Sequence, residues 1–169
     1  MSKFKIVRMM VLIAFATSIV LVGDVVAAEK GKVTYRQVFN VTTIHTLKVP
    51  DVEGHAYTLF EAKGILFSEK WGPGVVSMIA SFDLIKGAGT FQGYTHTTFP
   101  DGSTITAKFE GKSITTGVGL TGIGLSEATW TYVKGTGKFQ GIQGRGTSKS
   151  NTLAPGQFYA DAEGEYTLP

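Results

Sequence analysis

The sequence predicts an all-β protein in which eight antiparallel strands form one closed barrel. Alternating and β-branched runs are separated by turn residues at intervals of roughly 8 to 12 positions, as in sandwiches and barrels. No window of a dozen residues shows helical periodicity. An open sheet of eight strands would leave two exposed edges, which closure into a barrel removes. A two-sheet sandwich is the alternative.

The first 28 residues are typical of a cleavable export signal. Lys3, Lys5 and Arg8 precede an uncharged run from Met9 to Val22, and small residues, Val26-Ala27-Ala28, follow before Glu29. The uncharged run is shorter than the roughly 20 residues that cross a bilayer, so we expect no stable membrane anchor after cleavage. We therefore expect an exported protein, periplasmic or extracellular, whose single barrel domain covers residues 29–169.

Charge and composition exclude several classes of function. Cleavage removes three of the 16 basic residues and one of the 13 acidic ones, so the net charge falls from +3 to +1. The mature domain has no basic cluster that could neutralise several phosphates, so nucleic-acid binding is not expected. The chain has no Cys, which excludes disulfides, and His45, His55 and His96 do not have the spacing of metal ligands. We expect neither a metal nor a cofactor.

The strands are expected from the β-rich runs and the turn residues between them. The segment Pro100-Asp101-Gly102 is the strongest hairpin signal, because Pro presets φ in a turn and Gly accepts positive φ. The glycine-rich stretch at 117–124 predicts a mobile connection near an opening of the barrel. The expected strands lie near Val33–Leu47, His55–Phe67, Val75–Ile85, Thr90–Phe99, Ser103–Glu110, Leu125–Val133, Lys138–Thr147 and Gln157–Leu168.

An octapeptide occurs twice in the mature domain. Lys86 to Gly93 and Lys134 to Gly141 are identical at six of eight positions, 48 residues apart. Each copy is expected to follow one strand and begin the next, so its glycines predict a tight turn and a close approach of two backbones. A phosphate-cradling loop would need a following helix, which the sequence does not predict.

The second copy and its continuation, Gly135 to Arg145, resemble the Gly-Gly-Ser-Gly-x-Phe-Glu-Gly-x-x-Gly signature of allene oxide cyclases. They are also similar to the Gly-Thr-Gly-Lys-Phe stretch of plant dirigent proteins. The resemblance implies a calycin-like eight-stranded barrel with a cavity for a small, largely apolar molecule. The resemblance does not imply the catalytic mechanism of either family. The first-strand carboxylate of the cyclases is missing from Thr34–Leu47, and the dirigent arginine falls on Gln143, with Arg145 two residues further on.

Candidate ligand-binding residues lie in four of the expected strands. Tyr94 and His96 share one face of their strand and Thr95 and Thr97 the other, and either face can point into the barrel. Trp130 and Tyr132 also share a face, where they form a cavity wall or ordinary core. The remaining candidates are Asp83, Gln143 and Arg145.

Three functions follow from this interpretation, and the sequence leaves open whether the protein is an enzyme. The first is a secreted barrel that binds a small hydrophobic or aromatic molecule in its lumen. The second is a cofactor-free isomerase or cyclase, whose cavity folds a reactive substrate and excludes water. The third is a structural barrel with a filled interior that assembles through its outer face into a homo-oligomer, a dimer or trimer.

Overall fold

The computed structural model describes residues 28–116 and 123–169. All but the last residue of the predicted export signal, and most of the glycine-rich stretch at 117–124, lie outside these residues. Within them, the chain is almost entirely β-structure.

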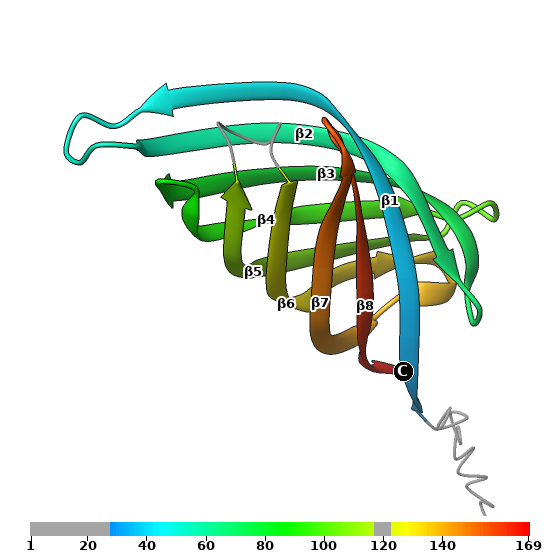
Figure 1. Cartoon of the computed structure of the whole chain (residues 1–169). Coiled ribbons are helices and arrows are strands. Elements are labelled where there is room, and N and C mark those ends of the chain that lie inside the picture. The colour runs from blue at the N-terminus through cyan, green and yellow to red at the C-terminus, as the bar shows by residue number, and fades with distance from the viewer. Residues whose placement is uncertain (1–27, 117–122) are drawn as a thin grey trace, which may run out of the picture.

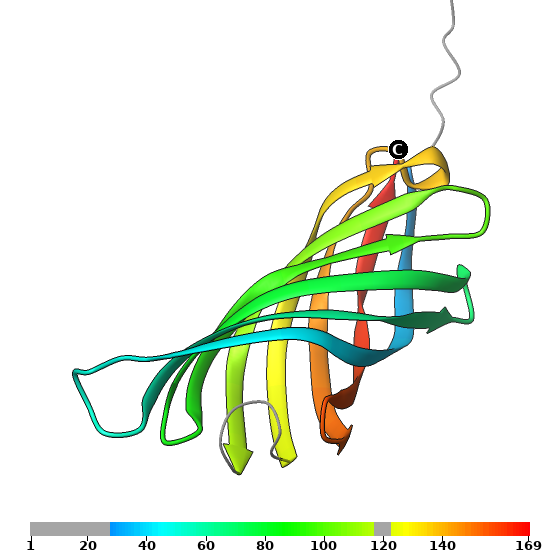
Figure 2. The same ribbon diagram turned by 90° about the horizontal axis from the view of Figure 1, so that it is seen from above.

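Eight strands form one closed barrel (Figures 1 and 2). Each strand pairs antiparallel with the next, and β1 pairs antiparallel with β8. This arrangement confirms the predicted antiparallel barrel. The strands are β1 (Glu29–Lys48), β2 (His55–Ser68), β3 (Gly72–Ile85), β4 (Ala88–Thr98), β5 (Thr104–Thr116), β6 (Ile123–Thr136), β7 (Gln143–Ala154) and β8 (Gln157–Leu168).

The strand directions define two ends of the barrel. The turns after β1, β3 and β7 lie at one end, which we call the upper mouth, together with the end of β5 and the start of β6. The turns after β2, β4 and β6 lie at the other, the lower end, where Glu29 pairs with Leu168. The long hairpin of β1 and β2 projects beyond the upper mouth (Figure 1).

Inward and outward residues alternate along the strands, as the pleat requires. In β4, Thr95 and Thr97 are buried, with 8% and 4% of their surface exposed, whereas Tyr94 and His96 are exposed. The threonine face of β4 therefore points into the barrel. The buried residues of β5 include the apolar set expected from its alternation, Ile105, Ala107 and Phe109.

The Pro100-Asp101-Gly102 turn joins β4 to β5, which confirms the predicted hairpin. Gly102 has a φ of +81° and donates its N–H to the Phe99 carbonyl at 2.9 Å. The Asp101 carboxylate accepts the Ser103 N–H at 3.0 Å. Both residues thus play their usual roles in turns: Gly adopts a positive φ, and the Asp side chain binds a backbone N–H two residues further on.

The two copies of the octapeptide have different structures. In the first copy, Lys86 (φ +50°) and Gly87 (φ +83°) form the two-residue turn between β3 and β4, as expected. The second copy continues β6 to Thr136 and then forms a 3₁₀ turn, η2 (Gly137–Phe139). The prediction that this copy begins a strand is therefore wrong.

The error shifts the seventh strand, which runs from Gln143 to Ala154 and not from Lys138 to Thr147. The reason lies at the lower end of the barrel. Phe139 and Ile142 are almost fully buried there, and the Ser103 hydroxyl accepts the Lys138 N–H at 3.1 Å. Packing of these two apolar side chains favours a compact turn over an extended strand.

Candidate functional site

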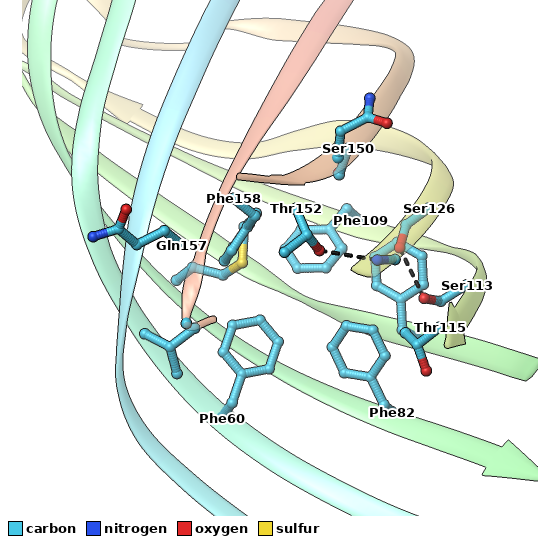
Figure 3. A pocket seen from close by; sticks show the side chains of 16 residues that line it. Phe60, Phe82, Phe109, Ser113, Thr115, Ser126, Ser150, Thr152, Gln157 and Phe158 are labelled. Carbon is cyan, nitrogen blue, oxygen red and sulfur yellow. Dashed lines mark hydrogen bonds between the residues drawn. The ribbon is translucent and has the colours of Figure 1, made fainter. Parts of the chain in front are cut away.

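A cavity of about 70 Å³ opens at the upper mouth of the barrel (Figure 3). We call it the upper cavity. One water molecule needs roughly 10–15 Å³ by this measure, so the upper cavity has room for several waters or for a small organic group. The apolar side chains of its floor come from β1 to β5 and from β8. The polar residues of its rim come from β5 to β8.

The floor of the upper cavity is aromatic. Phe82 and Phe91 stack with ring centroids 5.0 Å apart, and Phe109 lies 5.7 Å from Phe91. Phe60 packs against Phe82 at 5.3 Å and meets Phe158 edge-on at 6.1 Å. These rings present both faces and edges to the cavity, a surface suited to an apolar or aromatic group.

The rim of the upper cavity carries hydroxyl and amide groups. Some are already engaged: the Ser126 hydroxyl donates to Ser113 Oγ at 2.9 Å, and Thr152 Oγ1 accepts the Gly124 N–H at 3.0 Å. Three others, on β7 and β8, make no side-chain hydrogen bond within the described residues and are free to bind a ligand. These are Ser150, Asn151 and Gln157.

Among the described residues, no Asp, Glu, Lys, Arg or His side chain lines the upper cavity. An ionised group that entered it would lose hydration without gaining an opposite charge, which costs several kcal/mol. The described lining therefore offers no opposite charge to an ionised group.

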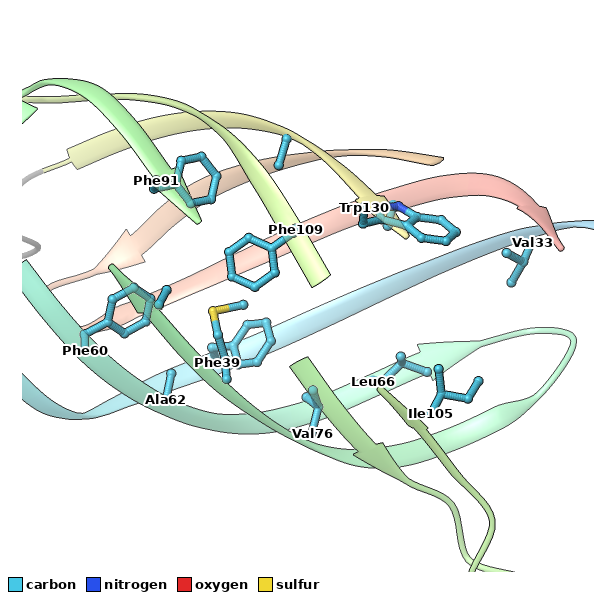
Figure 4. Packing of buried hydrophobic residues seen from close by; sticks show 14 of the residues in the cluster. Val33, Phe39, Phe60, Ala62, Leu66, Val76, Phe91, Ile105, Phe109 and Trp130 are labelled. Carbon is cyan, nitrogen blue, oxygen red and sulfur yellow. The ribbon is translucent and has the colours of Figure 1, made fainter. Parts of the chain in front are cut away.

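Below the upper cavity the barrel is filled by side chains (Figure 4). Phe39 is completely buried and stacks on Phe158 with ring centroids 4.9 Å apart. Trp130 crosses to β7 and β8, where Gly146 and Gly164 leave space for its ring. Its indole N–H donates to the Thr147 carbonyl at 3.1 Å. This packed middle layer separates the upper cavity from the lower end.

The predicted site residues divide between the two faces of the barrel. Trp130 is buried and Tyr132 half-buried inside it, and their rings are 4.8 Å apart, below the upper cavity. The other five point outward, away from the lumen, and therefore do not contact a ligand bound inside the barrel. These are Tyr94, His96, Asp83, Gln143 and Arg145.

Asp83 belongs to an outer cluster that links three segments. His55 Nε2 lies 2.6 Å from Asp83 Oδ1, and His55 Nδ1 lies 2.6 Å from Asp51 Oδ1. The hydrogen bonds to Asp83 and to Asp51 raise the pKa of His55 above its ordinary value. The bond to His55 in turn lowers the pKa of Asp51. The cluster fastens the turn after β1 to the end of β3.

The rim residues of β7 were missed in the sequence. Ser150 and Thr152 lie beyond Thr147, where the seventh strand was expected to end. Period-two alternation through Ser148, Ser150 and Thr152 was the available signal, and the shifted strand boundary obscured it.

The fold and the upper cavity define a class of protein: a closed, eight-stranded antiparallel barrel with an aromatic-floored cavity at one mouth. No protein-family model and no curated protein matches the chain. The chain is similar to the crystal structure of a conserved protein of unknown function from Rhodopseudomonas palustris. The identity is 9% and the TM-score 0.51, over 82% of this chain and 97% of that one.

The chain is also similar to a pterocarpan synthase dirigent protein, with 12% identity and a TM-score of 0.48, over 83% of this chain and 91% of that one. At such identities the likeness to the Rhodopseudomonas protein is one of fold alone.

Two other features are absent from the described ranges, 28–116 and 123–169. These ranges contain no helix of the length and hydropathy needed to cross a membrane. Across the same residues, no group of three or more His, Asp or Glu side chains has the arrangement of a metal site.

Proposed function

We propose that the protein binds a small, neutral molecule in the upper cavity, and that it does so after export from the cytoplasm. The molecule combines an apolar, preferably aromatic, part with one or more hydroxyl or carbonyl groups. The separation of an aromatic floor from a rim of hydroxyls and amides is the observation that carries this proposal.

The two parts of the upper cavity act on different parts of the ligand. Burial of apolar surface against Phe82, Phe91 and Phe109 supplies affinity at roughly 25 cal/mol per Å². The free groups of Ser150 and Asn151 supply orientation, because they donate or accept hydrogen bonds that bulk water would otherwise satisfy.

The other two functions receive less support from the geometry. A cyclase or isomerase that moves protons needs an acid or base near the substrate, and the described lining of the upper cavity offers hydroxyls and amides. A barrel filled throughout fits the middle layer around Phe39 and Trp130, but not the upper mouth. Binding is the function that uses both regions.

Benzyl alcohol and benzoate provide a test, because they differ chiefly in charge at neutral pH. We expect benzyl alcohol to produce saturable NMR shifts at the residues of the upper cavity. We expect benzoate to bind at least about tenfold more weakly, a difference of about 1.4 kcal/mol. Equal affinity for the two probes would contradict the selection for neutral molecules.

A matched pair of variants locates the binding site. Ser150 faces the upper cavity, whereas Thr147 lies on the outer face of the same strand. Ser150→Phe fills the cavity and is expected to abolish the saturable shifts, and Thr147→Phe is expected to preserve them. Binding that survives Ser150→Phe would place the ligand elsewhere.

A further inference from the structure

A second, smaller void lies in the lower half of the barrel, on the other side of the packed middle layer. Its volume is about 10 Å³, close to the space that one water molecule needs. We call it the lower chamber. Unlike the floor of the upper cavity, its wall is rich in polar side chains, namely Tyr35, Gln37, Thr95, Thr97 and Tyr132.

These polar side chains form no hydrogen bond with the residues that the structure describes. The Tyr132 hydroxyl is fully buried and makes no hydrogen bond to the described residues. The side chains of Tyr35, Gln37, Thr95 and Thr97 likewise form no hydrogen bond within the described part of the chain. A buried hydroxyl without a partner costs about 1–3 kcal/mol, and native proteins seldom leave such groups unsatisfied. The buried, unpaired Tyr132 hydroxyl, beside other polar side chains that line the same void, indicates a bound oxygen or nitrogen atom.

The two tyrosines offer donors to that atom. Burial raises the pKa of Tyr35 and, together with the neighbouring Tyr35 and Tyr166 hydroxyls, that of Tyr132. Both phenols therefore keep their protons at neutral pH, and each can donate to an acceptor. Gln37 adds an amide that both donates and accepts. A neutral oxygen, which accepts two hydrogen bonds, fits this set.

A local irregularity in the pairing of β5 with β6 lies beside the lower chamber. The pairing of β5 with β6 shifts between Thr106 and Ala107, so that Val133 is an extra residue in β6 next to Tyr132. Such bulges redirect neighbouring side chains and are common next to functional sites. Ala107 pairs with both Thr95 and Tyr132, and its small side chain leaves the space between them open.

Trp71 closes the lower chamber from the lower end of the barrel. Its ring lies 6.1 Å from Tyr132, 5.2 Å from Phe139 and 5.3 Å from Tyr166, measured between centroids. It lies in the short connection between β2 and β3, before Gly72. The Trp71 side chain therefore forms one wall of the chamber and shields it from solvent.

We propose that the lower chamber is a second binding site, in which Tyr132, Tyr35 and Gln37 hold the oxygen of a small neutral molecule. The chamber as it stands has the volume of one water molecule, and a carbonyl oxygen, which is the same kind of acceptor, enters it only when the chamber is widened. This site is independent of the function proposed for the upper cavity, because the packed middle layer lies between them.

The first test measures whether the Tyr132 hydroxyl has a partner. Tyr132→Phe removes that hydroxyl, and Tyr94→Phe removes an exposed hydroxyl on the outer face as the control. A hydroxyl that holds an oxygen contributes to stability, so we expect Tyr132→Phe to lower the Tm by about 2–4 °C and Tyr94→Phe to leave it unchanged. An unchanged or higher Tm for Tyr132→Phe would overturn the proposal.

The second test identifies the source of the oxygen. A long-lived water is expected to give NMR cross-peaks with protons of Thr95, Thr97 and Ala107 in the wild-type protein. For the carbonyl source, Trp71→Ala opens the lower chamber, and cyclohexanone is titrated as the probe. Saturable shifts at the same three residues, weakened about 5- to 10-fold by adding Tyr132→Phe, would identify a carbonyl site. Neither water cross-peaks nor saturable shifts at these residues would overturn the proposal.

Discussion

The ring of Trp130 occupies the space that a side chain at Gly146 would need. A Cβ at this glycine would lie 2.4 Å from Cζ2 of the indole and 2.0 Å from the Glu163 carbonyl oxygen. The absence of a side chain on β7 thus lets an aromatic ring from β6 fill the barrel, and it lets the neighbouring strand approach closely.

Gly146→Ala is therefore expected to destabilise the barrel. Overpacking of a well-packed core typically costs 1–3 kcal/mol, because side chains and backbone must shift. Urea unfolding monitored by tryptophan fluorescence measures the loss. Thr147→Ala, at the adjacent outward position, is the control and should change the free energy of unfolding by less than about 0.5 kcal/mol. Equal stability of the two variants would mean that the core adjusts without strain.

Lys86→Asn is expected to stabilise the protein. Lys86 has a φ of +50°, which costs energy for a lysine, whereas Asn adopts this conformation readily and Asn-Gly is favoured in such turns. The expected gain is about 0.5–1 kcal/mol in the free energy of unfolding. Lys134 occupies the same place in the second octapeptide but lies in β6, where Asn is disfavoured, so Lys134→Asn should bring no gain. A similar gain from both substitutions would contradict the explanation.

The pH dependence of stability is expected to report on His55. Its pKa is raised by Asp83 and Asp51, so its contribution is complete below the ordinary histidine value of 6.5 and disappears as the pH rises through the raised value. The pKa of Asp51 is lowered, so its contribution is present above 3.8 and disappears as the pH falls through the lowered value. The cluster therefore stabilises the folded protein most between pH 3.8 and pH 6.5.

Urea unfolding of the wild type and of His55→Gln at a series of pH values provides the measurement. The difference in stability should shrink as the pH rises above neutrality. His45→Gln is the control, because His45 is exposed and contacts neither carboxylate. A difference that stays constant from pH 5 to pH 9 would show that the charge of His55 does not matter.

Ser103→Ala is expected to weaken the turn that replaces the predicted start of β7. The Ser103 hydroxyl is buried and accepts the Lys138 N–H, so its removal leaves this donor without its partner. The expected cost is about 1–3 kcal/mol. Amide hydrogen exchange at Lys138 should accelerate accordingly, while Ser77→Ala on the outer face should leave it unchanged. Slow exchange in Ser103→Ala would indicate that another group accepts the N–H.

The barrel could be predicted from the sequence because its strands and hairpins leave local signals. The alternation of Ile105, Ala107 and Phe109 identified a buried face, and Pro100-Asp101-Gly102 identified the turn before it. Both signals involve neighbours in the chain, and both are confirmed.

The candidate site was less accessible to such reasoning. Both faces of β4 carry polar residues, since the inner one borders the lower chamber, so the apolar side could not be chosen from sequence. The pair His55 and Asp83 is separated by 28 residues and meets through the register of β2 and β3. The second octapeptide resembles the first, but Phe139 packs into the lower end, and long-range burial overrides local similarity.

The packed middle layer closes the barrel below the upper cavity. Phe39 and Trp130 block its cross-section, so a molecule that enters the upper cavity has to leave by the route through which it came. Ligand binding and ligand release then pass through the same opening and cross the same barrier. Substitutions at the rim that slow capture should slow release as well, and residence time becomes adjustable with little change in affinity.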